Sequence, residues 1–290
     1  MLQVKPKYIR LKSLTEEIHL LCISDVHHAQ DSSSEEELIK DLKEPRPNRL
    51  IIGIGDELDS ICRADKRHRI EDLKDRFTYK HVYPRLTDAE IEDYGAILGE
   101  LSKPEEWLGH ISGNHPYVMT QYNTDPVGRL CDMLEHPYLG YSAFVPVVFD
   151  CCGQRLNFMI VAHHGFGGAN SRKEGASLNS YIDHALRYDG WDLALYGHRH
   201  DRWAKIVPKI APQFGGKKKS PLWLKAEDRV VAQCGTYQRT LAHGEMPTYS
   251  ERMGYPPKPI GALVLRYKFT RGRNNDGARE ARLEYLGSNS

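Results

Sequence analysis

The chain has 290 residues, with 40 Lys and Arg against 39 Asp and Glu, so its formal net charge is +1. This length supports one large α/β domain with an ample core, or two small domains. With this balanced charge, the protein as a whole has no electrostatic attraction for nucleic acid or for a membrane surface. No stretch approaches the roughly 20 apolar residues that span a bilayer, and residues 1–15 lack the apolar run of a secretory signal.

Cysteine usage indicates a reducing compartment. The six cysteines are Cys22, Cys62, Cys131, Cys151, Cys152 and Cys234. None of them forms the Cys-x-x-Cys spacing of a zinc knuckle, and Cys22 lies within an apolar run. We therefore expect reduced, mostly buried thiols rather than a disulfide framework. These features together predict a soluble cytoplasmic protein with no membrane partner.

The first part of the chain predicts a strand, a helix and a second strand. Residues 18–24 and 50–55 are apolar runs typical of buried strands. Between them, serines at 32–34 precede three glutamates, which is the pattern of a helix N-terminus, and the helix should end before Pro45. The crossover is expected to be parallel and right-handed. Acidic residues follow both strands, at the edge where open α/β sheets bind ligands.

Charged sequence with helical spacing follows from about residue 65 to residue 108. It predicts a helical insertion of two helices broken near Pro84, then a short strand at 107–112. A further helix is expected at 127–134. The lysines at 217–219 indicate a solvated loop.

Strands dominate the remainder, at 142–149, 156–162, 193–196, 230–233 and 260–269. An α/β half followed by a β-richer half predicts two sheets packed face to face with helices outside. We assign residues 1–270 to a single domain and residues 271–290 to a polar tail that is expected to fray.

Short motifs of metal-ligating residues recur at the ends of the apolar runs. In chain order they are Asp25-Val-His27, Gly55-Asp56 with Asp59, Gly113-Asn114-His115, His163-His164 and Gly197-His198-Arg-His200. Each alone is weak, because Gly and Asn are common in turns and the chain has 14 histidines. Turns do not require ligands in this order at successive strand ends. Carboxylates, imidazoles and amide oxygens bind divalent cations, so the set predicts a metal centre.

Two divalent ions about 3.5–4 Å apart can clamp a phosphoryl displacement. A bridging carboxylate at a strand end would hold such a pair together, and Asp56 is the candidate. A hydroxide bridging the two metals would be the attacking group. A nearby imidazole, held in its charged form by a carboxylate, would protonate the leaving oxygen.

This motif series resembles that of the calcineurin-like metallophosphoesterase superfamily, from Asp25 to His200. The resemblance implies a four-layer α/β/β/α sandwich of two mixed β-sheets flanked by helices. It also implies a role for each matched residue. Asp25, His27 and His200 would hold one metal, Asp56 would bridge, and Asn114, His198 and either His163 or His164 would hold the other. His115 would be the proton donor or phosphate contact, with Asp59 as its partner.

At two positions the sequence differs from the motif pattern of this superfamily. Pro116 stands where an acidic residue usually follows Gly-Asn-His. Ser60 stands where the phosphoprotein-phosphatase branch carries an arginine, which disfavours a Ser/Thr protein phosphatase. A following glycine favours His164 as the ligand, whereas family members with His-His-Pro favour His163. We prefer His164, and both histidines remain candidates.

The sequence therefore predicts a phosphomonoesterase or phosphodiesterase with two divalent ions, which would be Mn, Fe, Zn or Ni. One alternative is a nuclease of the same superfamily acting on DNA or RNA, which the near-neutral charge supports weakly. Another is a non-catalytic protein-binding scaffold, which the complete ligand set disfavours. His28 either lines the site or packs. The residues expected to be structural are His19, His68, His81, His110, His136, Tyr237, Tyr249 and Tyr255.

Overall fold

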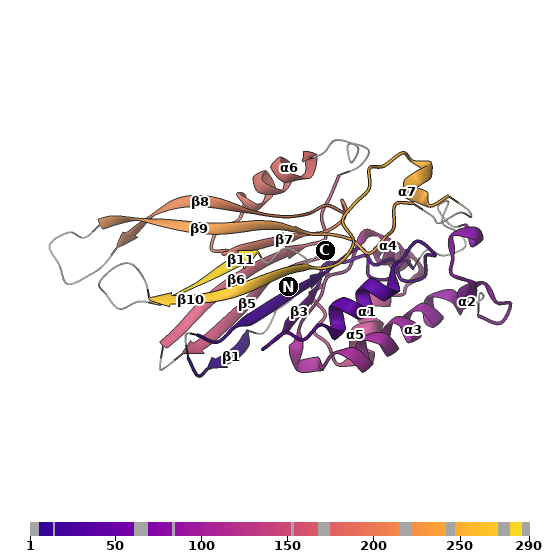
Figure 1. Ribbon diagram of the computed structural model, residues 1–290, viewed down its shortest axis with the longest axis horizontal. Coiled ribbons are helices and arrows are strands. Elements are labelled where there is room, and N and C mark those ends of the chain that lie inside the picture. Colours follow the sequence, from indigo (N-terminus) through magenta and orange to yellow (C-terminus); the bar gives the residue numbers. More distant parts are fainter. Residues whose placement is uncertain are drawn as a thin grey trace.

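Two mixed β-sheets form the centre of the molecule, and helices cover the outer face of each (Figure 1). The computed structural model describes residues 6–13, 15–60, 69–82, 85–151, 154–167, 175–214, 222–241, 247–271 and 279–285. The predicted four-layer α/β/β/α sandwich is confirmed.

The five-stranded sheet has the order β11-β10-β2-β3-β4. Its strands are β2 (Ile18–Ile23), β3 (Leu50–Gly53), β4 (Trp107–His110), β10 (Leu263–Arg271) and β11 (Arg279–Tyr285). β2, β3 and β4 are mutually parallel, while β10 is antiparallel to both of its neighbours. The three parallel strands therefore bring their carboxyl ends to one edge.

The six-stranded sheet has the order β1-β5-β6-β7-β9-β8. Its strands are β1 (Lys7–Leu11), β5 (Ser142–Cys151), β6 (Gln154–His163), β7 (Leu193–Tyr196), β8 (Arg202–Phe214) and β9 (Leu222–Cys234). β6, β7 and β9 are parallel, so their carboxyl ends also meet at one edge.

Seven α-helices lie in the described part of the chain. They are α1 (Glu35–Lys43), α2 (Asp75–Thr78), α3 (Leu86–Leu101), α4 (Asn114–Val118), α5 (Pro126–Leu134), α6 (Ala176–Ala185) and α7 (Tyr249–Arg252). Helix α5 shows why its sequence begins a helix: Asp125 accepts a hydrogen bond from the amide of Gly128, and Pro126 occupies the first turn. None of the described helices is long and apolar enough to cross a membrane.

Apolar side chains fill the interface between the two sheets and the interface between each sheet and its helices. Cys22 and Ile52 of one sheet pack with Ile160 and Leu195 of the other in the central core. On the outer face of the five-stranded sheet, Leu21 belongs to a second core that includes residues of α1, α3 and α5. A third core lies between α6 and the six-stranded sheet. Strands buried on both faces read as continuous apolar runs, which explains residues 18–24 and 50–55.

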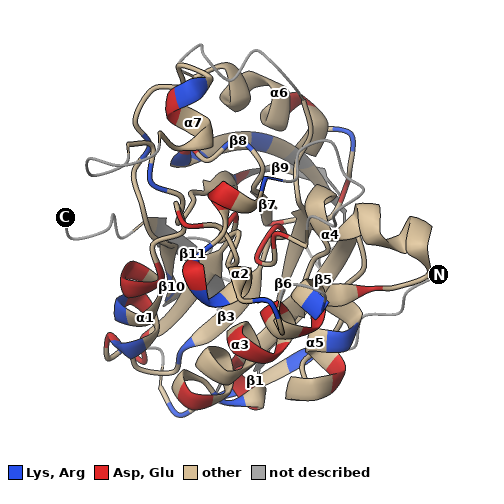
Figure 2. Cartoon of the chain, turned by 90° about the vertical axis from the view of Figure 1, so that its right-hand side faces the viewer, with Lys and Arg blue, Asp and Glu red and all other residues tan. Residues whose placement is uncertain are grey.

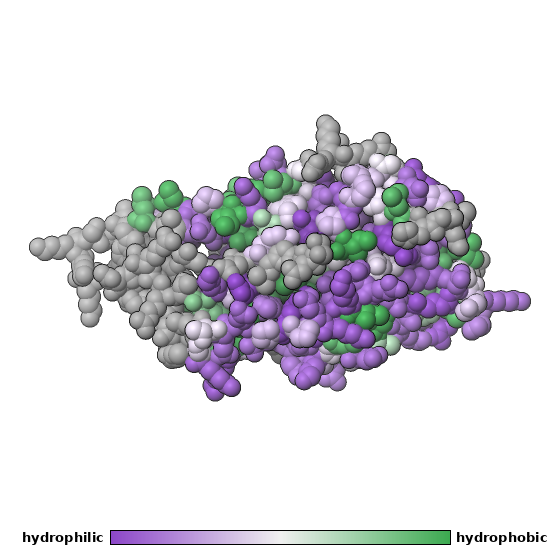
Figure 3. Space-filling model, viewed as in Figure 1, coloured by the Kyte–Doolittle hydropathy of each residue, from purple (hydrophilic) through white to green (hydrophobic). Residues whose placement is uncertain are grey.

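Figure 3 shows the outer surface over α1 and α3 as mainly hydrophilic, with separate hydrophobic groups. This agrees with helices that bury one face only. Leu38 and Leu42 of α1 are buried, whereas three glutamates occupy its first turn.

Each sheet combines strands from distant parts of the chain. β10 and β11 complete the sheet begun by β2, and β1 pairs with β5 in the other sheet. Part of the expected polar tail is strand β11, because pairing with β10 satisfies the backbone of 279–285 without an apolar run. In the expected helical insertion, α3 is one long helix after Pro84, and the preceding helix is short. The lysines at 217–219 lie outside the described residues.

Candidate metal centre

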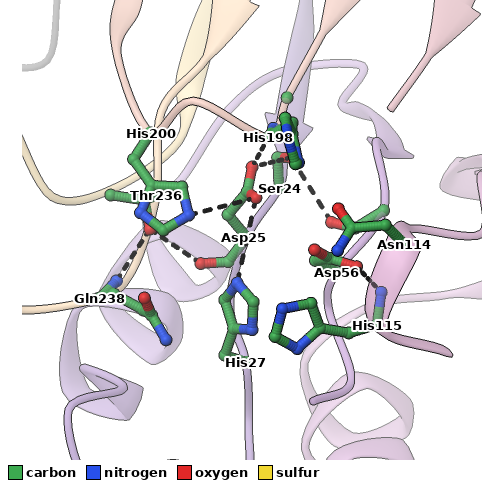
Figure 4. A network of polar contacts seen from close by, with 12 residues as sticks. Ser24, Asp25, His27, Asp56, Asn114, His115, His198, His200, Thr236 and Gln238 are labelled. Carbon is green, nitrogen blue, oxygen red and sulfur yellow. Dashed lines mark hydrogen bonds and ion pairs between the residues drawn. The ribbon is translucent and has the colours of Figure 1, made fainter. Parts of the chain in front are cut away.

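The motif residues meet at the edge of the sandwich where the parallel strands end. Asp25 follows β2, Asp56 follows β3, Asn114 begins α4 after β4, His164 follows β6 and His198 follows β7. Figure 2 looks onto this end of the molecule, where acidic residues lie near the centre, below α7. Figure 4 shows the side chains from both sheets directed toward one another. The predicted convergence is therefore present.

The first group consists of Asp25, His27 and His200, whose ligand atoms lie within 4.8 Å of one another. Asp25 Oδ1 is 4.0 Å from His27 Nε2 and 3.4 Å from His200 Nε2. Asp25 Oδ1 and His27 Nε2 are both buried and have no hydrogen-bond partner among the described residues. Buried polar atoms rarely lack a hydrogen-bond partner in native proteins. One carboxylate and two imidazoles converging in this way fit a divalent cation.

The second group consists of Asp56, His164 and His198, with Asn114 beside them. His164 Nε2 lies 3.1 Å from Asp56 Oδ2 and 3.1 Å from Asn114 Oδ1. His164 Nδ1 and His198 Nε2 each lie 2.8 Å from a backbone carbonyl. Since a carbonyl only accepts, these nitrogens carry the protons, and His164 Nε2 and His198 Nδ1 are left as ligand atoms.

His163 does not join the cluster, although the sequence kept it as a candidate ligand. It accepts a hydrogen bond from the amide of Gly165 at 2.8 Å, and its ring contacts Tyr141 and His184. His163 is the last residue of β6, and successive strand residues point to opposite faces. His164, fully buried, is the member directed at the candidate metal centre.

Asp59 connects the two proposed chemical roles of the site. Its Oδ1 accepts a hydrogen bond from His115 Nδ1 at 3.0 Å, as expected, and from His27 Nδ1 at 3.1 Å. Gln30 donates to Oδ2 at 3.0 Å. The contact to His27 was not predicted, because Asp59 was considered only as the partner of His115. One carboxylate thus orients two imidazoles and leaves each Nε2 directed away from it.

Charge in the site is strongly coupled. Burial alone would raise the pKa of Asp25, but His200 lowers it to about 2. Burial likewise opposes ionisation of Asp56, yet His164 holds its pKa well below the usual range. In return, although burial lowers the pKa of His164, Asp56 raises it to about 9. A cation bound here would take the place of the histidine proton.

The backbone is strained at the ligand positions. Five site residues that are not glycine have positive φ: Asp25 (50°), His27 (48°), Asp56 (48°), His198 (71°) and His200 (60°). Such conformations cost energy and persist where the surrounding structure imposes them.

At two motif positions only glycine fits, because a neighbouring loop lies too close for a side chain. A Cβ on Gly113 would lie 2.0 Å from Asp56 Oδ1, and a Cβ on Gly197 would lie 2.1 Å from Ser24 Oγ. The ligand-bearing loops therefore touch one another through glycine.

Glutamates that the sequence did not single out hold the loop after β3. Glu90 of α3, completely buried, accepts hydrogen bonds from the amides of Asp59 at 2.6 Å, Ser60 at 2.9 Å and Ala29 at 3.2 Å. It therefore ties together the loops that follow β2 and β3. No local motif marks this residue, since it lies 30 residues from the loop it holds.

Glu57 anchors the same loop from behind. It accepts hydrogen bonds from Tyr94 and from His110, at 2.8 and 2.9 Å. His110 in turn contacts His136, and both rings stack on Trp107. These histidines are structural, as expected.

His28 packs away from the metal centre. It contacts Asp93 at 2.6 Å and its ring lies 5.1 Å from that of Tyr94. Asp93 and Glu35 lie near it, but Arg76 bonds to both carboxylates, so this group is an ion-pair network.

A cleft of about 880 Å³ opens beside the ligands. The residues that line it include His27, Asp56, Asn114, His115, His198, Arg199, His200, Tyr249, Met253, Tyr255 and Lys258. A volume of this size accommodates a small organic molecule.

No protein-family model matches the chain, and no curated protein does. Solved structures with similar folds include Vps29 complexed with zinc from Entamoeba histolytica, at 12% identity and a TM-score of 0.36, covering 92% of this chain and 98% of that one. A metallophosphoesterase from Sphaerobacter thermophilus matches at 14% identity and a TM-score of 0.35, covering 93% and 90%. GAP50, the anchor in the inner membrane complex of Plasmodium, matches at 11% identity and a TM-score of 0.43, covering 93% and 88%.

Proposed function

We propose that the protein is a metal-dependent phosphoester hydrolase with two divalent cations. The observation that carries this proposal is the pair of adjacent ligand groups that share one edge of the sandwich. Asp56 belongs to the group with His164 and His198 and also lies beside His27 and His115. That position supports its role as the bridging ligand.

Two divalent cations bound here would activate water and neutralise the phosphate. The chain would hold them through Asp25, His27 and His200 on one side. On the other side, Asn114, His164 and His198 would serve, with Asp56 between.

His115 is proposed as the proton donor to the leaving oxygen. Its Nδ1 bonds to Asp59, its side chain is 18% exposed, and it lines the cleft. Asp59 is suited to this role because its own pKa is held low: burial opposes ionisation, but hydrogen bonds from His115 and His27 outweigh it. An ionised carboxylate favours the charged imidazole that gives up a proton.

Replacing the bridging carboxylate tests the proposal. With Mn²⁺ present, the protein is expected to hydrolyse 4-nitrophenyl esters of phosphate, and Asp56→Asn should lower kcat about 100- to 1,000-fold. The exposed Asp228 on β9 provides the matched control, since Asp228→Asn should keep full activity. Undiminished turnover by Asp56→Asn with unchanged metal content would exclude this mechanism.

The alternatives predict different behaviour. A nuclease would cleave DNA or RNA, and neutralising the lysines at 217–219 would weaken that cleavage. A scaffold would turn over no phosphoester at all. The complete ligand set disfavours the scaffold, and the net charge of +1 gives little support to a nuclease.

A further inference from the structure

Arg199 stands between two of the proposed ligands, His198 and His200, and lines the cleft beside them. Its Nε donates to the carbonyl of Phe166 at 3.3 Å. Its guanidinium lies against Gly167, where a Cβ would come within 2.1 Å of Nη2. The loop that follows His164 thus fixes the guanidinium at the metal-bearing edge of the cleft.

The other cations that line the cleft have carboxylate partners. Arg252 pairs with Asp72 at 2.8 Å, Arg69 pairs with Glu71 at 2.8 Å, and Lys258 pairs with Asp201. Among the described residues, no carboxylate lies within ion-pair distance of Arg199. In the described part of the chain, Arg199 is therefore the cleft cation that remains available to a phosphate oxygen of a substrate.

The two classes of phosphate ester differ in charge and in the number of organic groups on phosphorus. A phosphomonoester carries close to two negative charges at neutral pH, because its second pKa is about 6, whereas a phosphodiester carries one. A guanidinium also contacts two phosphate oxygens at once. Arg199 is therefore suited to contact two phosphate oxygens of either ester class.

An apolar wall lies on the α7 side of the same cleft. Tyr249, Met253, Tyr255 and Pro256 line it, and the rings of Tyr249 and Tyr255 lie 6.2 Å apart. Tyr249 is 49% exposed, which differs from the packing role expected from sequence. Partly exposed aromatic rings facing a cleft favour a planar organic group, and an ionised oxygen placed against them would lose its hydration. The wall therefore favours a diester, in which a second organic group replaces the second charged oxygen of a monoester.

We propose, on the basis of the hydrolase function above, that the substrate is a small phosphodiester with a planar organic substituent. Arg199 contacts the phosphate, and the substituent that remains on phosphorus packs against Tyr249 and Tyr255. A water oxygen bonds to phosphorus while the other ester P–O bond breaks, which yields a monoester and an alcohol.

Three probes with the same leaving group test the substrate class. They are 4-nitrophenyl phosphate, methyl 4-nitrophenyl phosphate and phenyl 4-nitrophenyl phosphate, each assayed on the full chain with saturating Mn²⁺. Both diesters should exceed the monoester in kcat/KM, and the phenyl diester should exceed the methyl diester about tenfold. Preference for the monoester overturns this inference but leaves the hydrolase intact. Loss of all three activities in the wild type contradicts the hydrolase itself.

Arg199→Gln tests the phosphate contact. We expect kcat/KM for both diesters to fall about 10- to 100-fold, with Arg199→Lys in between. Elemental analysis of the bound metal separates this effect from loss of the neighbouring ligands. A variant within twofold of the wild type at equal metal content removes Arg199 from the proposal.

The double variant Tyr249→Ala/Tyr255→Ala tests the wall. The ratio of kcat/KM for the phenyl diester to that for the methyl diester should fall to about one or two. This ratio is insensitive to the fraction of folded protein, because both substrates report on the same molecules. Tyr8→Ala, an exposed tyrosine of β1, should keep the wild-type ratio. An unchanged ratio in the double variant contradicts the assignment of the wall.

Discussion

At the scale of single residues, Asp59 contacts two histidines with different proposed roles. Its Oδ1 accepts from His27, a proposed ligand, and from His115, the proposed proton donor. Orienting carboxylates of this kind affect metal affinity about 10- to 100-fold. The same carboxylate should therefore affect both metal binding and proton transfer.

Two variants separate these effects. Asp59→Asn should weaken Mn²⁺ binding about 10- to 100-fold and also lower kcat. His115→Asn should lower kcat about 100- to 10,000-fold while Mn²⁺ affinity stays close to that of the wild type. Metal titration followed by activity assays measures both quantities. Loss of metal in His115→Asn would instead make His115 a ligand.

The motif residues could be predicted from sequence because each follows an apolar run and contributes a side chain with metal-binding chemistry. His163 and His164 could not be separated that way, because the choice depends on which strand face each residue occupies. The second contact of Asp59 and the role of Glu90 depend on tertiary approach, which no local pattern records.

At the scale of elements, α3 holds the ligand loops through Glu90. Burial first, and then the charge of Asp59, raises the pKa of Glu90 to about 7. An unfolded glutamate titrates near 4.3, so the native state binds this proton more tightly. Its contribution to stability is fully present below the unfolded pKa and is lost as the pH rises through about 7.

Glu90→Gln, which stays uncharged, reveals this dependence. The free energy of unfolding of the wild type minus that of the variant should fall by about 1–3 kcal/mol between pH 5 and pH 8. Urea unfolding in the presence of a chelator measures it. The exposed Glu100 of α3 is the control, since Glu100→Gln should show no such trend. A difference that grows with pH would contradict the assignment.

The elements that the sequence predicted well are those with long apolar runs, such as β2, β3 and β6. β11 was missed because its sequence is polar, and β8 was missed because Pro208 and Pro212 interrupt its apolar residues. Each of them is an edge strand that pairs with one neighbour. Edge strands tolerate charge, so the amphipathic signal is weak there. The sheet to which each strand belongs could not be predicted either, because β10 pairs with β2 although most of the sequence separates them.

At the scale of the whole molecule, metal binding should contribute to stability. Buried carboxylates and strained backbone at the ligand positions favour a bound cation over the empty protein. Removing metal with a chelator should lower Tm by about 5–15 °C, and added Mn²⁺ should restore it.

Calorimetry with matched variants checks this expectation. Asp25→Ala should lose most of the increment, whereas Asp228→Asn should keep it. A Tm that does not respond to metal in the wild type would contradict the fit of the site to cations.

Neither sheet carries a complete ligand group by itself. Asp25 and His27 come from the five-stranded sheet and His200 from the other, and Asp56 and Asn114 likewise face His164 and His198 across the sandwich. Each proposed cation would therefore be coordinated by residues of both sheets and would crosslink the sheets at their shared edge. A displacement of one sheet relative to the other by about one atomic diameter would separate the ligands of both cations at the same time. We therefore expect no partial activity from a truncated chain that lacks either sheet.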